Sequence, residues 1–289
     1  MDEHDQLAGK FEENRVQLRA VAYRMLGSIS EAEDAVQEAW LRLSRSDTSE
    51  IQNLGAWLTT VVSRLCLDQL RSRKTRREDS LDVYVPDPIL GPPDPEEEAV
   101  QADAVGLAMM VVLEKLSPSE RLAFVLHDMF GLSFDEVAEI VDKTPAATRQ
   151  LASRARRRVQ GAPVTDNDAG RHREVVDAFL AASRSGDFEA LLAILDPDVI
   201  LRADAGTTGG GPAVSKLVRG ALAIVEQAVT FSKLAPPSRP ALINGYPGLV
   251  NVVGGTLTGV MDVIVRDGKI IEINILSDPA RLKTLPIPA

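Results

Sequence analysis

The stretch from Ser133 to Gln160 constrains this chain more than any other, because it predicts two helices joined by a tight turn. Ser133 is followed three residues later by Glu136, the pattern of a capping box at the start of the first helix. Thr144 is a favoured cap for the second helix, and Pro145 suits its first position, where no backbone N–H is needed. The stretch therefore predicts a helix-turn-helix.

The second of these helices has an apolar side and a basic side. Its apolar residues are spaced four apart: Ala147, Leu151, Ala155 and Val159. Its arginines are expected to face outward: Arg149, Arg154, Arg156, Arg157 and Arg158. An arginine-bearing second helix fits the major groove of DNA, with its N-terminal residues nearest the base edges. A structural helical pair with a solvated basic face is the alternative that this stretch alone leaves open.

The net charge of −10 is unusual for a DNA-binding protein, but the acids are concentrated in one segment. Residues 78–104 contain nine acids, five prolines and no Lys or Arg. The flanking segments are locally basic, and local charge is what phosphates sense. A segment of this composition buries little surface, so we expect residues 78–104 to be an extended or disordered linker.

Residues 11–77 predict a first helical domain. Apolar residues between Val16 and Leu26 recur at helical spacing, and Gly27 ends that helix. Ser30 with Glu33 has the pattern of a second capping box. Two further helices are expected, Glu31–Leu43 and Leu54–Arg71.

The third helix of this domain runs into a basic sequence. Five of the seven residues 71–77 are basic: Arg71, Arg73, Lys74, Arg76 and Arg77. The run favours contact with a phosphate backbone, and a solvated helix end is the equal alternative. Cys66, the only cysteine, lies in an apolar part of this helix, which predicts a core position and excludes an intramolecular disulfide.

Two parts of the chain resemble the extracytoplasmic-function sigma factors, group IV of the sigma-70 family. EAEDAVQEAWLRL (Glu31–Leu43) followed by GAWLTTVVSRLCLDQLRSRKTRR (Gly55–Arg77) is similar to their region 2. LSPSERLAFVLHDMFGLSFDEVAEIVDKTPAATRQLASRARRRVQ (Leu116–Gln160) resembles their region 4. The matches follow the family's order, which is more specific than a lone helix-turn-helix. The resemblance implies region 2 at 11–77, a linker at 78–104 and region 4 at 105–162.

The resemblance implies a sigma factor that binds core RNA polymerase and promoter DNA. Region 2 would dock on the polymerase clamp through Asp34, Gln37 and Glu38. The loop Ser44–Asn53 and the following helix would capture the melted −10 element, with a flipped base held in a loop pocket.

The second helix of the helix-turn-helix would read the −35 element. The candidates for base contacts are Arg149, Gln150, Ser153 and Arg154, and those for phosphate contacts are Arg156, Arg157 and Arg158. A bidentate contact between arginine and guanine contributes roughly 1–3 kcal/mol of discrimination.

Residues 166–289 predict an α+β domain, in which helices precede an antiparallel sheet. The expected helices are Glu174–Ser185, Phe188–Leu195 and Ala213–Phe231. The expected strands are Val199–Arg202, Ala241–Tyr246, Leu249–Val253, Leu257–Val265 and Lys269–Leu276. Asp267-Gly268 is a strong hairpin turn between the last two strands. The pattern resembles the SnoaL-like, NTF2-like cone.

One subfamily of these sigma factors joins such a cone to three short motifs, and this chain has weakened versions of each. Tyr84-Val85-Pro86-Asp87-Pro88 resembles the aromatic-Leu-Pro-Glu-Pro linker motif. Asp204-Ala205-Gly206 with Gly209-Gly210-Gly211 resembles the Asp-Gly-Gly-Gly loop, and Asp278-Pro279-Ala280-Arg281-Leu282 resembles the terminal Asn-Pro-Asp-Lys-Leu motif. We expect regulation in cis, with the cone holding the linker and region 2 in a compact arrangement, because one aromatic and two prolines offer apolar surface in an otherwise acidic linker. The residues expected at that contact are Tyr84, Pro86, Pro88, Asp204, Gly206, Asp278, Pro279 and Leu282. An independent, freely tethered domain is the alternative.

Cone folds often enclose an apolar pocket with a His or Asp acid–base group. Here we expect His172 to be exposed at the first helix, and Asp204 and Asp262 to be surface carboxylates at strand ends. No paired-carboxylate, metal-ligand or nucleophile–base pattern is visible, so no enzymatic activity, metal or cofactor is expected. The alternative is a bifunctional DNA-binding regulator whose cone binds a small ligand or acts as a cyclase or isomerase.

The first residues contain no apolar segment typical of a signal peptide, and no apolar run is long enough to cross a membrane. We therefore expect a cytoplasmic protein without a membrane partner.

Overall fold

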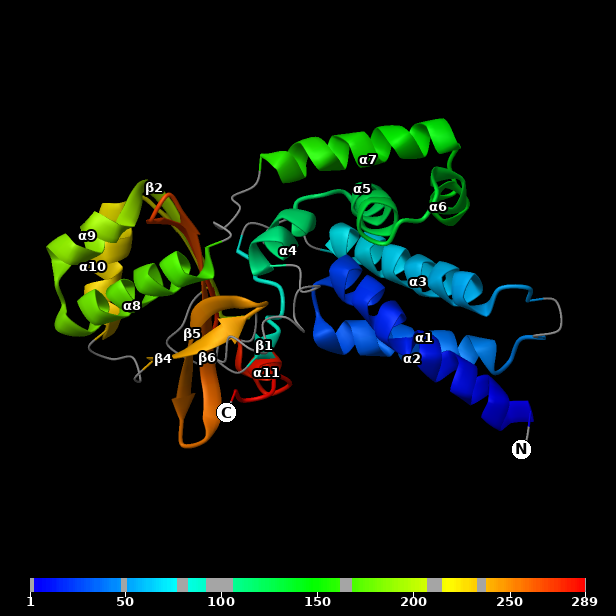
Figure 1. Ribbon diagram of the computed structural model, residues 1–289, viewed down its shortest axis with the longest axis horizontal. Coiled ribbons are helices and arrows are strands. Elements are labelled where there is room, and N and C mark those ends of the chain that lie inside the picture. The colour runs from blue at the N-terminus through cyan, green and yellow to red at the C-terminus, as the bar shows by residue number, and fades with distance from the viewer. Residues whose placement is uncertain are drawn as a thin grey trace. The chain divides into compact units, whose positions relative to one another are not determined.

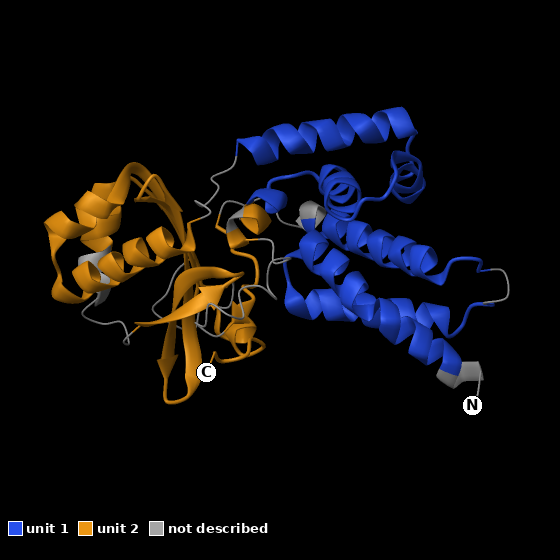
Figure 2. Ribbon diagram, viewed as in Figure 1, with its two compact units in different colours: residues 1–79, 112–161 blue, residues 80–111, 162–289 orange. Residues whose placement is uncertain are grey.

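A computed structural model of the protein describes residues 3–47, 51–76, 83–91, 106–161, 168–206, 215–232 and 238–288. The chain divides into two compact units, each built from two stretches of sequence (Figure 2). Unit 1 contains Met1–Asp79 and Val112–Gly161, and unit 2 contains Ser80–Val111 and Ala162–Ala289. The segment between the two helical regions is therefore grouped with the C-terminal domain.

Unit 1 begins with three helices, α1 (Glu3–Leu26), α2 (Ile29–Leu43) and α3 (Leu54–Arg76) (Figure 1). Gly27 ends α1 with a φ of +69°, as expected. The cap of α2 is Ser28, whose side chain accepts a hydrogen bond from the Glu31 backbone N–H. The prediction of Ser30 as cap was wrong, because the glycine turns the chain early enough for Ser30 to be helical already.

The interior of these three helices follows much of the predicted apolar pattern. The buried residues of α2 are Ala32, Ala35, Val36, Ala39 and Leu43. Cys66 of α3 is buried as expected, and burial raises the pKa of its thiol to about 12. Val16, placed in the apolar stripe of α1 from its spacing, is 81% exposed. Spacing alone did not identify which side of α1 is covered.

The second part of unit 1 contains the predicted helix-turn-helix. Its elements are α4 (Leu107–Glu114), at which the two units divide, α5 (Pro118–Ala123), the π-helix η3 (Phe124–Met129), α6 (Phe134–Val141) and α7 (Pro145–Gln160). The capping box of Ser133 and Glu136 starts α6, and Thr144 caps α7 with Pro145 in its first turn. Asp142 adopts a left-handed conformation, with a φ of 56°, which turns the chain between α6 and α7.

Polar contacts, one of them from the buried Arg121, join the two parts of unit 1. The guanidinium of Arg121 on α5 donates to the carbonyl of Arg24 on α1 at 2.9 Å and to Glu114 at 2.5 Å. Arg64 on α3 donates to the carbonyl of Glu139 on α6 at 3.1 Å. A buried guanidinium needs such partners because an unpaired charge in the interior is strongly destabilising.

Unit 2 is a seven-stranded sheet with helices against one face (Figure 1). The strand order is β1-β4-β5-β6-β7-β2-β3. The strands are β1 (Leu90–Gly91), β2 (Leu195–Asp204), β3 (Lys216–Arg219), β4 (Ser238–Ile243), β5 (Tyr246–Val253), β6 (Thr256–Arg266) and β7 (Lys269–Leu276). The helices are α8 (Ala169–Ser185), α9 (Phe188–Ile194), α10 (Ala221–Ser232) and α11 (Pro279–Leu282). The core lies between the sheet and α8, α9 and α10, where Val176, Phe179, Leu191, Ile224 and Ile273 are buried.

The expected order, two all-α regions and then an α+β domain, is confirmed, with three differences within the sheet. The helix predicted over 213–231 instead begins as strand β3, and α10 starts only after Gly220, which has a φ of +88°. Strands β2 and β7 pair in parallel, whereas all other neighbours are antiparallel. The Asp267-Gly268 hairpin is confirmed. A second hairpin at Asn244-Gly245 was missed, although Asn-Gly is itself a strong turn signal.

Residues 83–91, here called the strap, form part of unit 2 although they precede region 4 in sequence. Leu90 and Gly91 pair antiparallel with Ile243 and Leu242 of β4. Val85 and Asp87 are buried. This portion of the linker is therefore an edge of the sheet, and the expectation that the linker buries little surface was wrong for it.

Candidate polymerase and nucleic-acid interfaces

The exposed side of α2 carries the residues expected to bind polymerase. Asp34 and Gln37 are exposed, and half-buried Glu38 accepts a hydrogen bond from Arg42 at 2.9 Å. Sequence reasoning missed Leu41, which continues the same stripe and is 38% exposed. An exposed leucine beside polar residues suits a protein–protein contact. Its position, four residues after Gln37 and three after Glu38, was the available signal.

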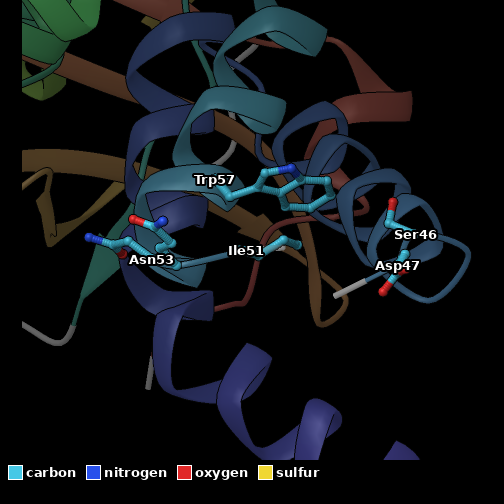
Figure 3. A pocket seen from close by; sticks show the side chains of 6 residues that line it. Ser46, Asp47, Ile51, Asn53 and Trp57 are labelled. Atoms are coloured by element: carbon cyan, nitrogen blue, oxygen red, sulfur yellow. The ribbon is translucent and has the colours of Figure 1, made fainter. Parts of the chain in front are cut away.

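A hollow of about 500 Å³ opens where the expected −10 loop meets α3 (Figure 3). It is lined by Ser46, Asp47, Ile51, Gln52, Asn53 and Trp57. Trp57, predicted to face the core, is half-buried, and its indole extends from the start of α3 toward the side where Ser46 and Asp47 lie (Figure 3). Residues 48–50 of the expected loop lie outside the described residues. An indole with amide and carboxylate groups around it can stack on an unpaired base and hydrogen-bond its edge.

The basic end of α3 divides into inward and outward residues. Arg73 donates to the carbonyl of Leu26 at 2.9 Å and pairs with Glu31, and its side chain is only 17% exposed. Its expected phosphate contact is contradicted by this geometry, because the guanidinium is held within the three-helix part of unit 1. Arg71 is exposed, with Asp68 at 3.6 Å. The side chains of Lys74 and Arg76, and all of Arg77, lie outside the described residues.

The outer side of α7 carries three of the four expected base-reading residues. Arg149, Gln150 and Ser153 are exposed in one stripe, and Arg157 continues it one turn later. The guanidinium carbon of Arg149 lies 5.5 Å from the ring centroid of Phe134 on α6, a cation–π contact. The cation–π contact places the Arg149 guanidinium beside the start of α6.

The other three arginines of α7 are held by acids of the same domain. Arg154 and Arg158 both bind Glu120 on α5, at 3.0 and 2.6 Å. Arg156 binds Asp128 on η3 at 2.5 Å. The guanidinium of Arg154, which was expected to contact a base, is engaged at the flank of α7.

Glu120 stays ionised between these arginines. Burial alone would raise its pKa, but hydrogen bonds from Ser117 and the charges of Arg158 and Arg154 hold the pKa of Glu120 below its ordinary value. The same carboxylate completes the capping box of α5.

In unit 2, a single guanidinium holds the strap. Arg281 of α11 donates to Asp87 at 2.6 Å, to the carbonyl of Val85 at 2.6 Å and to Asp204 at 2.8 Å. Its guanidinium carbon lies 4.8 Å from the ring centroid of Tyr84. Arg281 and Asp87 were not among the expected contact residues, although both lie inside the motifs that predicted the contact.

Backbone hydrogen bonds complete this contact. The Val85 N–H donates to Asp204 at 3.1 Å, and the Ile89 N–H donates to the side chain of Asn244 at 3.0 Å. The Asn244 N–H in turn donates to the Ile89 carbonyl at 2.8 Å. Asn244 was missed, because its partner lies 155 residues away in sequence.

The structure brings most of the remaining motif residues to the same place. Asp278 caps α11, and a Cβ at Gly206, which has a φ of +75°, would clash with the Asp278 carboxylate. Leu282 is buried, and Pro86 and Pro88 of the strap are buried too. Pro279 is exposed in the first turn of α11, and Gly209, Gly210 and Gly211 lie outside the described residues.

The candidate acid–base residues of the cone differ from their predicted exposure. His172 is fully buried and stacks on Tyr246 with the ring centroids 6.0 Å apart, and Asp204 and Asp262 are also buried. Burial raises the pKa of Asp262 to about 7, and the side chain of Asn274 donates to it at 3.3 Å. The predicted exposure was wrong for Asp204 because the strap contacts it through the Val85 N–H. It was wrong for Asp262 because this residue lies within β6, opposite Asn274 of β7, and not at a strand end. Among the described residues, no group of His, Cys, Asp and Glu is arranged to hold a metal.

Comparisons with known proteins agree with this arrangement. The family model for sigma-70 region 2 matches residues 11–76, and that for sigma-70 region 4 matches residues 107–159. The ECF RNA polymerase sigma factor SigJ of Mycobacterium tuberculosis is 39% identical over 96% of this chain and 94% of its own length. The chain belongs to the extracytoplasmic-function sigma factors.

A second relative and a crystal structure of SigJ support the assignment of this sigma factor along its length. SigI of M. tuberculosis is 34% identical over 99% of the chain and 98% of its own length. The crystal structure of M. tuberculosis SigJ matches with a TM-score of 0.75 and 36% identity, covering 96% of this chain and 99% of that one. The sigma factor therefore binds core RNA polymerase and directs promoter-specific initiation. None of its described helices is long and apolar enough to cross a membrane.

Proposed function

We propose that the C-terminal unit of this sigma factor regulates promoter-specific initiation in cis, by holding the strap. The observation that carries the proposal is the set of contacts around Arg281, which joins α11 and β2 to Tyr84, Val85 and Asp87 of the strap. In sequence, the strap lies between region 2 and region 4. A unit that holds the strap therefore acts on the tether that lets these regions reach the −10 and −35 elements.

The contacts between Arg281 and the strap are more specific than a pairing of edge strands alone. Asp87 and Asp204 are both buried, and each carboxylate forms an ion pair with Arg281. Removing the cation would leave two buried carboxylates without compensation, which is costly in a low-dielectric environment. The strap, which is part of this tether, is ordered as long as the Arg281 guanidinium is in place. Ordering part of a flexible chain reduces the range of separations that its ends can sample.

The promoter contacts are assigned within the same proposal. The docking surface on polymerase comprises Asp34, Gln37, Glu38 and Leu41. The hollow lined by Trp57 receives a base of the melted −10 element, and the −35 element is read by Arg149, Gln150 and Ser153. Arg71 and Arg157 contact phosphates. Action on core polymerase also places the protein in the cytoplasm.

The test is Arg281→Ala in the full chain, with Arg266→Ala as the matched control. Arg266 is an exposed arginine of β6 in the same unit, so both variants lose one positive charge. We expect faster amide hydrogen exchange in the strap and a severalfold change in promoter-specific transcription with core polymerase, for Arg281→Ala only. Truncation after Gly161 should change transcription in the same direction. Regulation in cis is refuted if the strap exchanges faster while transcription stays at the wild-type level in both variants.

A further inference from the structure

The arginines of α7 form two groups that their sequence does not distinguish. Arg149 and Arg157 lie on the exposed stripe, and within the described residues neither takes part in an ion pair. Arg154 and Arg158, one helical turn apart, both bind the carboxylate of Glu120 on α5. One acid therefore contacts two successive turns of the recognition helix.

We propose that Glu120 is a positioning residue for −35 recognition. By holding Arg154 and Arg158, it fixes the rotation of α7 about its own axis, so that Arg149, Gln150 and Ser153 face the base edges. The inference rests on the proposed role of α7 in reading the −35 element and adds a residue that touches no DNA.

Both oxygens of Glu120 are occupied. Oε1 accepts from Nε of Arg154 at 3.0 Å. Oε2 accepts from Nη1 of Arg158 at 2.6 Å and from the backbone N–H and hydroxyl of Ser117 at 3.1 and 2.8 Å. The residue is 5% exposed. Because Ser117 ties the carboxylate to the first turn of α5, the two arginines are anchored to a backbone and not to a mobile surface acid.

The apolar contacts of α7 leave this orientation incompletely determined. Its buried residues are Thr148, Leu151, Ala152 and Ala155, of which only Leu151 is large, and alanines offer little side chain to resist a small rotation. Successive residues are about 100° apart around a helix, so a modest rotation displaces the tips of long side chains. A bidentate contact requires its groups to lie within about 0.5 Å of their productive geometry. Two charge-assisted hydrogen bonds on one flank supply that constraint.

Glu120 also withholds positive charge from DNA. Nonspecific affinity rises with each cation that reaches a phosphate, and so does its dependence on salt. Releasing Arg154 and Arg158 should strengthen binding to every sequence while weakening the preference for one. A variant that was merely less stable would lose binding to all sequences alike.

The test is Glu120→Gln, because glutamine at this position still forms a capping box with Ser117 but carries no charge for the arginines. Glu136→Gln is the matched control. It makes the same change in the capping box of α6, where the carboxylate accepts hydrogen bonds from Ser133. Both variants are assayed as full chains with core polymerase, on promoter DNA with a randomised −35 element and a constant −10 element.

For Glu120→Gln we expect discrimination between the preferred −35 sequence and its single-base variants to fall about tenfold. We also expect a steeper salt dependence of binding, while Glu136→Gln matches the wild type in both measurements. Wild-type discrimination in Glu120→Gln overturns the positioning role. A wild-type protein without any −35 preference overturns the proposed function of α7, and the positioning role with it.

A second variant, Arg154→Met, removes one side of the contact and keeps the aliphatic stem. If Glu120 positions α7, this variant weakens discrimination at several −35 positions, as Glu120→Gln does. A loss confined to one base pair would assign Arg154 to that base and overturn the proposal. The measurement on Arg154→Met tests the positioning role even if Glu120→Gln fails to fold.

Discussion

Arg281 lies over the ring of Tyr84, with its guanidinium carbon 4.8 Å from the ring centroid, although nearly the whole of region 4 and the C-terminal domain separates them in sequence. The same guanidinium binds Asp87 and the carbonyl of Val85. The linker motif and the terminal motif therefore form one contact within unit 2.

The ring of Tyr84 should contribute to holding the strap. Tyr84→Ala removes the cation–π contact, and we expect hydrogen exchange of residues 83–91 to accelerate several-fold. Tyr84→Phe keeps the aromatic face and should retain more of the protection than Tyr84→Ala does. If residues 83–91 exchange as slowly in Tyr84→Ala as in the wild type, the ring contributes nothing to holding the strap.

Charge reversal on α2 should weaken polymerase binding without unfolding the protein. Asp34 is exposed and Glu38 is half-buried, so Asp34→Lys with Glu38→Lys removes acids from a polar side of the helix. Co-purification with core polymerase and thermal melting are measured together. Glu13→Lys, an exposed position on α1, is the control for charge. Undiminished co-purification of the double variant would exclude this side of α2 from the interface.

Two arginines of α7 should separate base reading from phosphate binding. Arg149→Ala should reduce discrimination at one −35 position, because its guanidinium lies on the exposed stripe near the N-terminal part of the helix. Arg157→Ala should weaken binding to all sequences and lower the salt slope by about one. A screen of promoter variants at two salt concentrations distinguishes them. Equal, sequence-independent losses would leave α7 as a phosphate-binding helix only.

Trp57 should stabilise an unpaired base in the hollow at the start of α3. Trp57→Ala is expected to weaken binding of single-stranded −10 DNA to the polymerase complex by roughly 1–3 kcal/mol, the contribution of one base stacked on an aromatic ring. Trp57→Phe retains a stacking face and should recover most of the affinity. The assignment of the hollow fails if the alanine variant binds the single strand as tightly as the wild type does.

Asp262 should make the stability of unit 2 depend on pH. Its pKa is raised from 3.8 to about 7 by burial, so the folded state retains a proton that the unfolded chain has lost at intermediate pH. The free energy of unfolding should therefore fall as pH rises from about 4 to about 7, and level off above that range. Asp262→Asn should remove this part of the pH dependence, measured by thermal melting at pH 5 and pH 8. If the difference in melting temperature between pH 5 and pH 8 is the same in Asp262→Asn as in the wild type, the pH dependence of stability arises from another group.

Local signals predicted the helix-turn-helix and its caps. Ser133 bonds with Glu136, and Thr144 accepts from the Ala147 N–H, each within one helical turn, so the residues that form each cap are also neighbours in sequence. The Asp267-Gly268 hairpin was predictable for the same reason, since its two residues must adopt positive φ and their types favour it. The family motifs added the order of the domains.

Contacts between distant elements were decided only by the tertiary structure. Spacing placed Arg154 and Arg73 on outward sides of their helices, but it could not show that Glu120 and Glu31 meet them there. His172 and Asp262 are buried because other elements cover them, and β1 forms because β4 offers an unpaired edge. Periodicity within one segment records which side of it is apolar. The partner that reaches the polar side comes from elsewhere in the chain, and only packing brings the two together.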